Sequence, residues 1–411
     1  MKPHPRAVES ALAEIERQTL TRLRRTVEGF DAAGGAEVVV EGRRLVNFCG
    51  NDYLGLAHHP EVIAALRAAA ATYGVGSGAS HLVTGHGREH ECLEEELARF
   101  VGRERALLLS TGYMANLAAV TALAGRGDLL LLDRLSHASL IDAALLSRAR
   151  LRRYPHADAP AVRRMLALES GHDRSRDGAP ERVTLIATDG VFSMDGDIAP
   201  LTELAGAAAQ QDAWLLVDDA HGLGVLGHGG RGTLEHLGLD ATAVPLLMGT
   251  LGKAFGTFGA FLAGSHEVIE LILQRARSYI YTTATPQALA AATRAALSLA
   301  QREPWRRERA LALSARFRSA AREQGLPVAH SLTPIQPILL GSAEAALSAS
   351  RRLLASGFWV TAIRPPTVPR NTARLRVTLS AAHTESQVDA LVAALADAWR
   401  RSVPAATPRS A

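Results

Sequence analysis

The chain has 411 residues, of which 47% are hydrophobic and 21% charged, and its formal net charge at pH 7 is +4. This composition is that of a globular protein with room for one large domain and one or two smaller ones. No uncharged apolar run reaches the about 18 residues that span a bilayer, and the basic residues are scattered, so we expect neither a membrane protein nor a nucleic-acid-binding protein. Two cysteines, Cys49 and Cys92, are too few for a disulfide framework or a metal cluster, which favours a reducing, cytoplasmic compartment.

Residues 1–48 are expected to form an N-terminal helix and a strand pair. Apolar residues recur at helical spacing from Val8 to Val27, with arginine and glutamate between them. This pattern predicts a solvated amphipathic helix and not a targeting signal. Glu37–Phe48 then has the alternation of two strands around a turn.

Residues 49–290 are expected to form a large α/β domain. It opens with a polar turn at Asn51–Gly55 and a helix at Pro60–Tyr73, after which apolar strands alternate with helices. This alternation predicts a mostly parallel sheet with helices on both faces, whose ligands bind beyond the carboxyl ends of the strands. The predicted strands are Ala106–Leu109, Leu129–Leu132, Val183–Ala187, Trp214–Val217, Pro245–Met248 and Phe258–Leu262, and the helices include Tyr113–Leu123, Ser139–Ala149 and Leu201–Gln211.

Two segments have the composition of irregular structure: Gly171–Pro180, within the large domain, is expected to be an exposed loop, and the residues after Val403 a loose tail.

Residues 291–411 are expected to form a smaller α+β domain. The elements predicted for this part are helices at Pro286–Arg302 and Trp305–Gln324, a strand at Ile335–Leu340, a helix at Ala343–Ala355, strands at Phe358–Ile363 and Arg374–Leu379, and a closing helix at Ser386–Arg400.

The segment Thr250–Gly256 contains Lys253, and every other cation in the chain except Lys2 is an arginine. A guanidinium stays protonated, whereas a desolvated lysine amine loses its proton and forms Schiff bases with carbonyl compounds such as pyridoxal phosphate. Small neighbours such as Gly252 let a cofactor approach the backbone, and the apolar runs on both sides indicate buried strands. These observations favour a chemical role for Lys253 over a chance surface position.

Polar groups also follow other predicted strands. Ser110–Asn116 turns from a strand into a helix, where free N–H groups suit either a phosphate or simple N-capping, and the residues alone do not separate the two. Asp218 and His221 follow a strand that is too apolar to be exposed. An aspartate there would keep a pyridine nitrogen protonated, and a histidine would hydrogen-bond a phenolic oxygen. Gly222–Gly227 matches the dinucleotide fingerprint, but glycines follow it where a helix should begin.

Three single residues have both a functional and an ordinary interpretation. His137 begins a helix after a strand, where its ring could stack on a flat ligand, although alone it is more typical of a capping or core histidine. Ser193 follows a strand and is also typical of a turn serine. Arg364 is held by the prolines that follow it, and a fixed guanidinium suits a bidentate grip on a carboxylate, against the alternative of one more surface arginine.

Taken together, these segments resemble the pyridoxal-phosphate-dependent α-oxoamine synthases. The resemblance implies an α/β, aspartate-aminotransferase-like fold of type I, with a large, mostly parallel sheet domain and a smaller α+β C-terminal domain. It runs from Asn51–Gly55 to the final helix, and its most specific part is the lysine segment Thr250–Gly256. Further matching segments are Leu135–Leu140, Val191–Asp197, Asp218–Gly222 and Ile363–Pro369.

The resemblance also implies roles for individual residues toward a pyridoxal 5'-phosphate cofactor and a substrate. The four residues implied to be catalytic are Lys253, which carries the cofactor, Asp218 at the pyridine nitrogen, His221 at the phenolic oxygen and His137 stacked on the ring. Gly112 and Tyr113 are implied to lie at the cofactor, Ser193 and Thr250 to bind it, and Arg24, Asn51, Arg364 and Thr367 to face substrate, with Arg22 and Arg25 as alternatives to Arg24.

The implied reaction is the decarboxylative condensation of L-alanine with a pimeloyl thioester of coenzyme A or acyl carrier protein, a step of biotin synthesis. Lys253 would remove the Cα proton as general base. The family resemblance further implies a homodimer with composite active sites. Sister synthases that use glycine with a short acyl-CoA are the alternative. A nicotinamide-dependent dehydrogenase is a more remote alternative, which only the motif Gly222–Gly227 supports.

Overall fold

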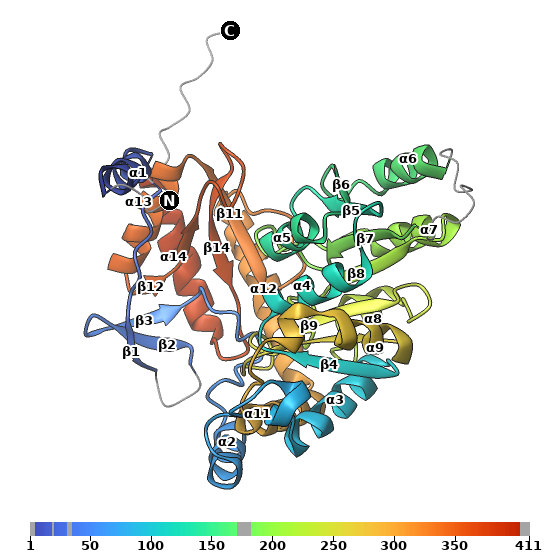
Figure 1. Cartoon of the computed structure of the whole chain (residues 1–411). Coiled ribbons are helices and arrows are strands. Elements are labelled where there is room, and N and C mark those ends of the chain that lie inside the picture. The colour runs from blue at the N-terminus through green and yellow to red at the C-terminus, as the bar shows by residue number, and fades with distance from the viewer. Residues whose placement is uncertain (1–4, 19, 31–34, 171–181, 403–411) are drawn as a thin grey trace. The chain divides into compact units, whose positions relative to one another are not determined.

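The computed structural model describes residues 5–18, 20–30, 35–170 and 182–402 (Figure 1). The loop expected at Gly171–Pro180 and the tail expected after Val403 lie outside the described residues. The chain divides into two compact units, one made of Asn51–Ser193 and Asp197–Arg309, and the other of Met1–Gly50, Met194–Gly196 and Ala310–Ala411. The division into three domains made from the sequence stays a prediction.

A seven-stranded sheet forms the centre of the larger unit. Strand β10 runs antiparallel to its neighbours β4 and β9, and the pairs from β9 to β6 are all parallel. The mostly parallel sheet predicted from the sequence is therefore confirmed. In sheet order the strands are β4 (Arg105–Leu109), β10 (Ala260–Gly264), β9 (Leu246–Thr250), β8 (Trp214–Asp218), β7 (Thr184–Asp189), β5 (Leu129–Asp133) and β6 (Arg150–Tyr154).

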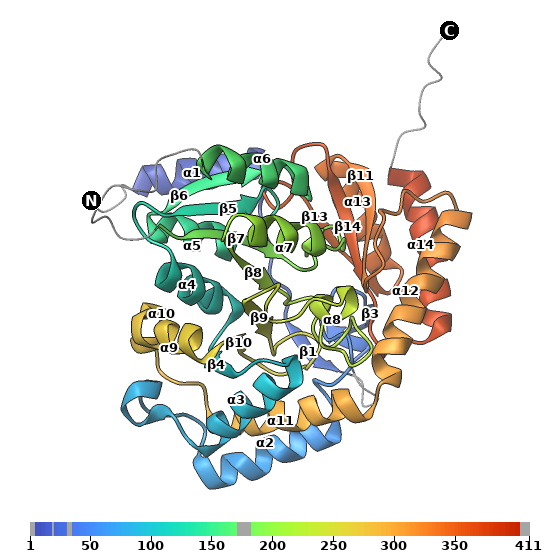
Figure 2. The same cartoon turned by 90° about the vertical axis from the view of Figure 1, so that its right-hand side faces the viewer.

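Helices cover both faces of this sheet, as the apolar strands require (Figure 2). Strand β5 shows how: Leu130 and Leu132 pack into the core cluster that contains helices α4 and α5, while Leu129 and Leu131 pack into the cluster that contains α6 and α7. The helices of this unit are α2 (Pro60–Tyr73), a π-helical turn η1 (His81–Gly85), α3 (Arg88–Val101), α4 (Gly112–Leu123), α5 (Ala138–Ser147), α6 (Ala159–Ser170), α7 (Leu201–Gln210), α8 (Thr233–Leu237), α9 (His266–Arg275), α10 (Arg277–Ile280) and α11 (Gln287–Arg302).

The smaller unit contains two sheets, one of which joins N-terminal strands to a strand near the C-terminus. One has the order β1-β2-β3-β12, in which β12 runs parallel to β3, and the other has the order β11-β14-β13. Buried residues of α12, α13 and α14 form one core with the second sheet and with Phe48. The elements are α1 (Pro5–Arg17), β1 (Val27–Phe30), β2 (Glu37–Val40), β3 (Arg43–Asn47), α12 (Trp305–Glu323), β11 (Ile335–Gly341), α13 (Ala343–Ala355), β12 (Phe358–Trp359), β13 (Thr361–Ile363), β14 (Ala373–Thr378) and α14 (Glu385–Ser402).

Three elements differ from the sequence-based expectation. The N-terminal helix ends at Arg17, and Val27 begins a strand instead. The single strand expected at Phe358–Ile363 is two strands in different sheets, because β12 pairs with β3 while β13 pairs with β14. Strand β6 was not predicted, since its arginines hide the apolar pattern at the edge of the sheet. Among the described residues, no helix is both long and apolar enough to cross a membrane.

Candidate active site

Four adjacent strands of the large sheet end in polar residues. In sheet order these are Thr250 on β9, Asp218 on β8, Asp189 on β7 and Asp133 on β5. Asp189 and Asp218 are paired in register. Because these four strands are parallel, their last residues meet along one edge, where α/β sheets bind ligands.

Lys253 lies in the loop after β9, within reach of a histidine from the loop after β8. Its Nζ is 3.1 Å from Nε2 of His221, and the side chain is half-buried. A tight turn holds the lysine, since the Gly256 N–H donates to the Lys253 carbonyl at 2.8 Å. Gly256 has φ of +66°, and a Cβ there would lie 2.3 Å from the backbone nitrogen of Ala57, so only glycine fits this turn.

The other nitrogen of the His221 ring contacts Tyr53. The Tyr53 hydroxyl lies 2.8 Å from Nδ1 of His221 and is also 3.3 Å from Oδ1 of Asn51. Tyr53 is 1% exposed and His221 is 7% exposed, so both are shielded from water. Tyr53, Asn51 and Lys253 therefore meet around one imidazole.

Asp218 is fixed by donors from two other elements. Its Oδ2 accepts a hydrogen bond of 2.7 Å from the Asn116 amide, and its Oδ1 accepts one of 3.1 Å from the Ala220 N–H. The same amide of Asn116 donates to Ser139 Oγ at 2.8 Å, and that hydroxyl lies 2.7 Å from Nδ1 of His137. A hydrogen-bonded chain thus links Asp218 to His137 through two buried side chains.

His137 caps helix α5 and presents an exposed ring at the sheet edge. Its backbone N–H donates to Asp189 Oδ2 at 3.0 Å. Desolvation lowers the pKa of His137, Asp218 opposes this effect, and Lys253 adds to it. Burial, followed by the charge of Asp218, raises the pKa of Asp189 well above its usual range. The ring of His137 is therefore expected to be neutral at pH 7, which suits stacking on an aromatic ligand.

The beginning of helix α4 lies next to Thr250, and the first N–H groups of a helix have no partner within the helix itself. The helix starts at Gly112 after the N-cap Thr111, whose hydroxyl accepts from the Met114 N–H at 3.2 Å. A Cβ on Gly112 would come within 2.8 Å of Thr250 Cγ2, so the helix start is packed directly against the end of β9. The helix has 12 residues, and its N-terminus beside the Thr250 hydroxyl is a suitable binding site for a phosphate.

Two other residues predicted for this site also belong to the larger unit. Tyr113 is 41% exposed, and its hydroxyl donates to Asp142. Ser193 is half-buried and follows β7. The structure therefore brings Lys253, Asp218, His221, His137, Gly112, Tyr113, Ser193, Thr250 and Asn51 into one unit.

The remaining predicted substrate residues lie in the smaller unit. Arg364 donates from Nη2 to the Thr21 carbonyl, and the Thr367 N–H donates to the Arg364 carbonyl at 3.1 Å. Burial, followed by the charge of Arg22, lowers the pKa of Arg364. Arg25 pairs with Glu41 at 2.9 Å, and Arg24 is exposed. Of the three N-terminal arginines considered, Arg22 thus acts electrostatically on Arg364, whereas Arg25 is tied to a carboxylate.

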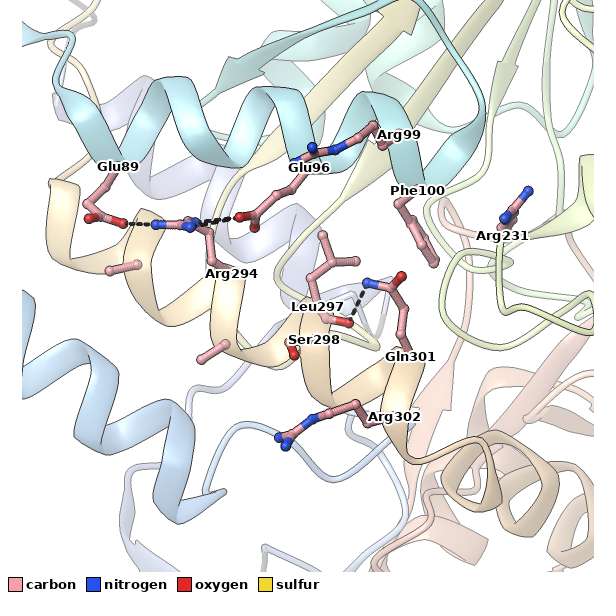
Figure 3. A pocket seen from close by; sticks show the side chains of 12 residues that line it. Glu89, Glu96, Arg99, Phe100, Arg231, Arg294, Leu297, Ser298, Gln301 and Arg302 are labelled. Carbon is pink, nitrogen blue, oxygen red and sulfur yellow. Dashed lines mark hydrogen bonds and ion pairs between the residues drawn. The ribbon is translucent and has the colours of Figure 1, made fainter.

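A cleft of about 800 Å³ lies elsewhere in the larger unit (Figure 3). Arg294 of α11 spans it and pairs with Glu89 at 2.7 Å and with Glu96 at 2.8 Å, both on α3. The hydrogen bond to Glu96 is the largest effect that raises the pKa of Arg294. None of the predicted site residues lines this cleft. Its ion pairs join helix α11 to helix α3, so we assign these ion pairs a structural role.

A cluster of histidines lies at the start of α3. His81 and His86 face each other with their Nδ1 atoms 2.9 Å apart, and His90 completes a group whose ring nitrogens are close enough to hold a metal ion. Both nitrogens of His90 are already engaged, however, with the Gly87 N–H at 3.0 Å and the Thr285 carbonyl at 2.7 Å. These bonds fix the turn into α3, which indicates a structural role for His90.

Sequence reasoning assigned no role to Tyr53, Asn116 or Asp189. Tyr53 and Asn116 each stand in a segment that the sequence had marked as polar or phosphate-binding, but their partners His221 and Asp218 are 168 and 102 positions away. Asp189 could have been found by its position, since it ends a strand next to Asp218. The predicted strand stopped two residues short of it, at Ala187, whereas the observed strand β7 ends at Asp189.

Comparison with known proteins gives the family. The family model for aminotransferase class I and II matches residues 43–395. The chain is 58% identical over 389 residues to the 8-amino-7-oxononanoate synthase of Methylococcus capsulatus, covering 95% of this chain and 97% of that one.

Two solved structures extend this comparison to the fold. A serine palmitoyltransferase from S. paucimobilis with a bound pyridoxal phosphate adduct superposes with a TM-score of 0.88 at 28% identity, covering 96% of this chain and 97% of that one. The 8-amino-7-oxononanoate synthase of Francisella tularensis superposes with a TM-score of 0.73 at 30% identity, covering 87% of this chain and 98% of that one. The chain therefore belongs to the class I and II aminotransferase family, and within it to the α-oxoamine synthases.

Proposed function

We propose that this protein is an 8-amino-7-oxononanoate synthase, which condenses L-alanine with a pimeloyl thioester and releases carbon dioxide. Several relatives that carry this name are 54–58% identical to the chain over most of its length, which supports the assignment. The observation that carries the chemistry is the approach of Lys253 Nζ to His221 Nε2 at the edge where Asp218 ends its strand. A non-catalytic protein has no need of an amine, an imidazole and a carboxylate gathered there.

The residues present fit pyridoxal 5'-phosphate. Asp218 is a buried, hydrogen-bonded carboxylate suited to the pyridine nitrogen, and His221 offers a ring nitrogen suited to the phenolic oxygen. The α4 start at Gly112 and Tyr113, with Ser193 and Thr250, would hold the phosphate, and the exposed ring of His137 would stack on the cofactor. When bound, the cofactor supplies an electron sink for the charge that develops at the amino acid Cα.

Different residues of the chain would have distinct roles in this reaction. Lys253 would hold the cofactor through its amine and, as a neutral amine, would take the Cα proton of the amino acid. Asp218 would hold the pyridine nitrogen protonated, because a buried carboxylate beside it favours the charged ring. Within the smaller unit, Arg364 and Thr367, with one of Arg22 or Arg24, would bind a substrate carboxylate, since a guanidinium held in place binds a carboxylate through two hydrogen bonds.

We also propose that the protein is a homodimer with composite active sites. Several large apolar side chains of the larger unit are exposed, which is what a partner subunit would cover. They include Val75, Leu82, Val83, Leu145, Leu146 and Tyr281.

The test is a substrate panel on purified protein loaded with pyridoxal phosphate. L-alanine, glycine and L-serine are each combined with pimeloyl, acetyl, succinyl and palmitoyl thioesters, and the condensation products are identified by mass spectrometry. We expect L-alanine with pimeloyl thioester to exceed every other pair in kcat/KM by at least about 100-fold, the discrimination that about 3 kcal/mol of pocket contacts provides. A preference for glycine with a short acyl-CoA, or for L-serine with the palmitoyl thioester, would assign the chain to a sister reaction. Running the panel with coenzyme A and acyl carrier protein thioesters separates the two acyl carriers.

A further inference from the structure

Tyr53 and Lys253 contact opposite nitrogens of the His221 ring. The Tyr53 hydroxyl is 2.8 Å from Nδ1, and Lys253 Nζ is 3.1 Å from Nε2. A neutral imidazole carries a proton on one nitrogen only. The hydrogen bond that Tyr53 makes at Nδ1 therefore decides whether Lys253 meets a donor or an acceptor at Nε2.

Two arrangements of the protons are compatible with these contacts, and they differ in where the single Tyr53 proton points. In the first, the Tyr53 hydroxyl donates to Nδ1, and its contact with Asn51 Oδ1 carries no hydrogen bond. The ring proton then lies on Nε2, and Nε2–H donates to the lone pair of a neutral Lys253 amine. In the second, the Tyr53 hydroxyl donates to Asn51 Oδ1, Nδ1–H donates to the Tyr53 oxygen, and the bare Nε2 accepts from a Lys253 ammonium.

The geometry favours the first arrangement. The hydroxyl lies at an ideal 2.8 Å from Nδ1 but at 3.3 Å from Asn51 Oδ1, which is long for an O–H donor. Tyr53 is 1% exposed, so water does not readily replace it. A lysine that is to attack a carbonyl carbon must also be uncharged, and only the first arrangement offers a donor to its lone pair.

We propose that Tyr53 is a positioning residue that fixes His221 as the Nε2–H tautomer and thereby keeps Lys253 a neutral amine. This inference rests on the function proposed above, since only a lysine that bonds a carbonyl gains from it. The same Nε2–H is the donor that the phenolic oxygen of the cofactor requires. The Tyr53 hydroxyl would therefore give His221 the proton position that suits both Lys253 and the cofactor.

Other charged groups act on the same lysine. Its charge influences Asp189 and His137, and Asp218 influences both of those groups in turn. The carboxylates favour the ammonium form, and His137 adds no positive charge while it stays neutral. The effect of Tyr53 is therefore measured as a difference between variants that leave these three side chains unchanged.

The lysine content of the chain makes the amine measurable by itself. In a Lys2→Arg background, Lys253 is the only lysine. The full-length, cofactor-free protein is treated with acetic anhydride at a series of pH values, and modification of Lys253 is read by peptide mass spectrometry. We expect Tyr53→Phe to raise the pKa of Lys253 by about one unit and to slow its acetylation near neutral pH by about tenfold. Tyr279→Phe is the matched control, because Tyr279 is also buried but its ring stacks on His81, and it should leave the pKa of Lys253 unchanged.

A double-mutant cycle separates an effect through His221 from a direct one. If Tyr53 acts through the ring, Tyr53→Phe has no further effect on Lys253 in a His221→Gln background. An equal effect in both backgrounds, or a folded Tyr53→Phe variant with the wild-type pKa of Lys253, overturns the proposal.

The tautomer is also observable without any substitution at Tyr53. In protein labelled with ¹⁵N-histidine, the signals lost in His221→Gln identify His221, and their shifts report which nitrogen carries the proton. Nε2–H supports the proposal and Nδ1–H overturns it. The acetylation and the ¹⁵N measurements both use cofactor-free protein, so their outcome is independent of the substrate panel. Failure of the substrate panel would reject the proposed function and not the role of Tyr53.

Discussion

Lys253 Nζ lies 3.1 Å from His221 Nε2 in a loop whose backbone is held by Gly256 and not by the amine. Removing the amine should therefore leave the fold intact and remove the chemistry. We expect Lys253→Ala to lower kcat by at least about 10³-fold and to abolish the absorbance of covalently bound cofactor. Lys253→Arg should be equally inactive, because it retains the charge without the nucleophile. Turnover close to wild type in either variant would exclude the lysine from the mechanism.

The arginines near the N-terminus differ in what they contact. Arg25 is paired with Glu41, whereas the charge of Arg22 reaches Arg364. We expect Arg364→Ala to raise the KM for a substrate carboxylate by at least about tenfold, the loss of one charge-assisted bond. Arg25→Ala should stay close to wild type, while Arg22→Ala and Arg24→Ala decide which of these two binds substrate. A rise in KM for Arg25→Ala as large as that for Arg364→Ala would contradict this division.

At the level of single elements, the start of α4 depends on the absence of a side chain at Gly112. A Cβ there would lie 2.8 Å from Thr250 Cγ2, which forces the helix start and the end of β9 apart. We expect Gly112→Ala to weaken cofactor binding by about tenfold or more, measured by fluorescence titration, because phosphate cradles need the backbone to approach closely. Gly206→Ala is the control, since a Cβ at Gly206 in α7 meets no atom within 4 Å. Equal affinities in the two variants would show that the α4 start does not hold the phosphate.

His156, just after β6, hydrogen-bonds two aspartates: Asp133 at the end of β5 and Asp197 in the segment after β7. Its ring lies 3.0 Å from Asp133 and 2.9 Å from Asp197. Burial, the largest single effect, lowers the pKa of His156, but the hydrogen bonds and charges of both aspartates together raise it to about 10. The folded-state pKa thus lies above the unfolded value of about 6.5.

This pKa gives a pH dependence of stability with a definite sign. A histidine with a raised pKa contributes stability that is complete below about pH 6.5 and is lost as the pH rises toward 10. The free energy of unfolding should therefore fall by about 2–4 kcal/mol between pH 7 and pH 10. His156→Gln should remove most of this slope in thermal melts, whereas His236→Gln, at an exposed position, should keep it. Parallel slopes in wild type and His156→Gln would contradict the prediction.

The sequence predicts elements best where burial imposes a pattern. The apolar strands β5, β7 and β8 were located within one or two residues, because strands covered on both faces are nearly continuous apolar runs. Strand β6 and the split between β12 and β13 were missed, since pairing partners, and not local residues, determine them. The same holds for the site: polar residues after strands were predicted, while the contacts of Tyr53 and Asn116 join segments more than 100 positions apart.

At the scale of the whole chain, the smaller unit is assembled from three separate segments. Val38, Val40 and Leu45 near the N-terminus form a small core with Leu354 and Trp359. We expect Trp359→Ala to destabilise this unit by about 2–3 kcal/mol, since truncating a partly buried aromatic residue leaves a cavity. Hydrogen exchange should show faster exchange in β2 and β3 and little change in the seven-stranded sheet. Equal acceleration in both units would mean that they unfold together.

This discontinuous assembly bears on how the chain is made. The strands β2 and β3 leave the ribosome more than 300 residues before β12, the strand that pairs with β3, has been synthesised. At roughly 5–20 residues per second, the first fifty residues wait tens of seconds with their apolar face uncovered. During that interval the larger unit, whose segments are nearly continuous, can fold. Chaperones that hold nascent chains are therefore expected to bind this protein at its N-terminal strands, and a circular permutant that begins near residue 310 would shorten the wait.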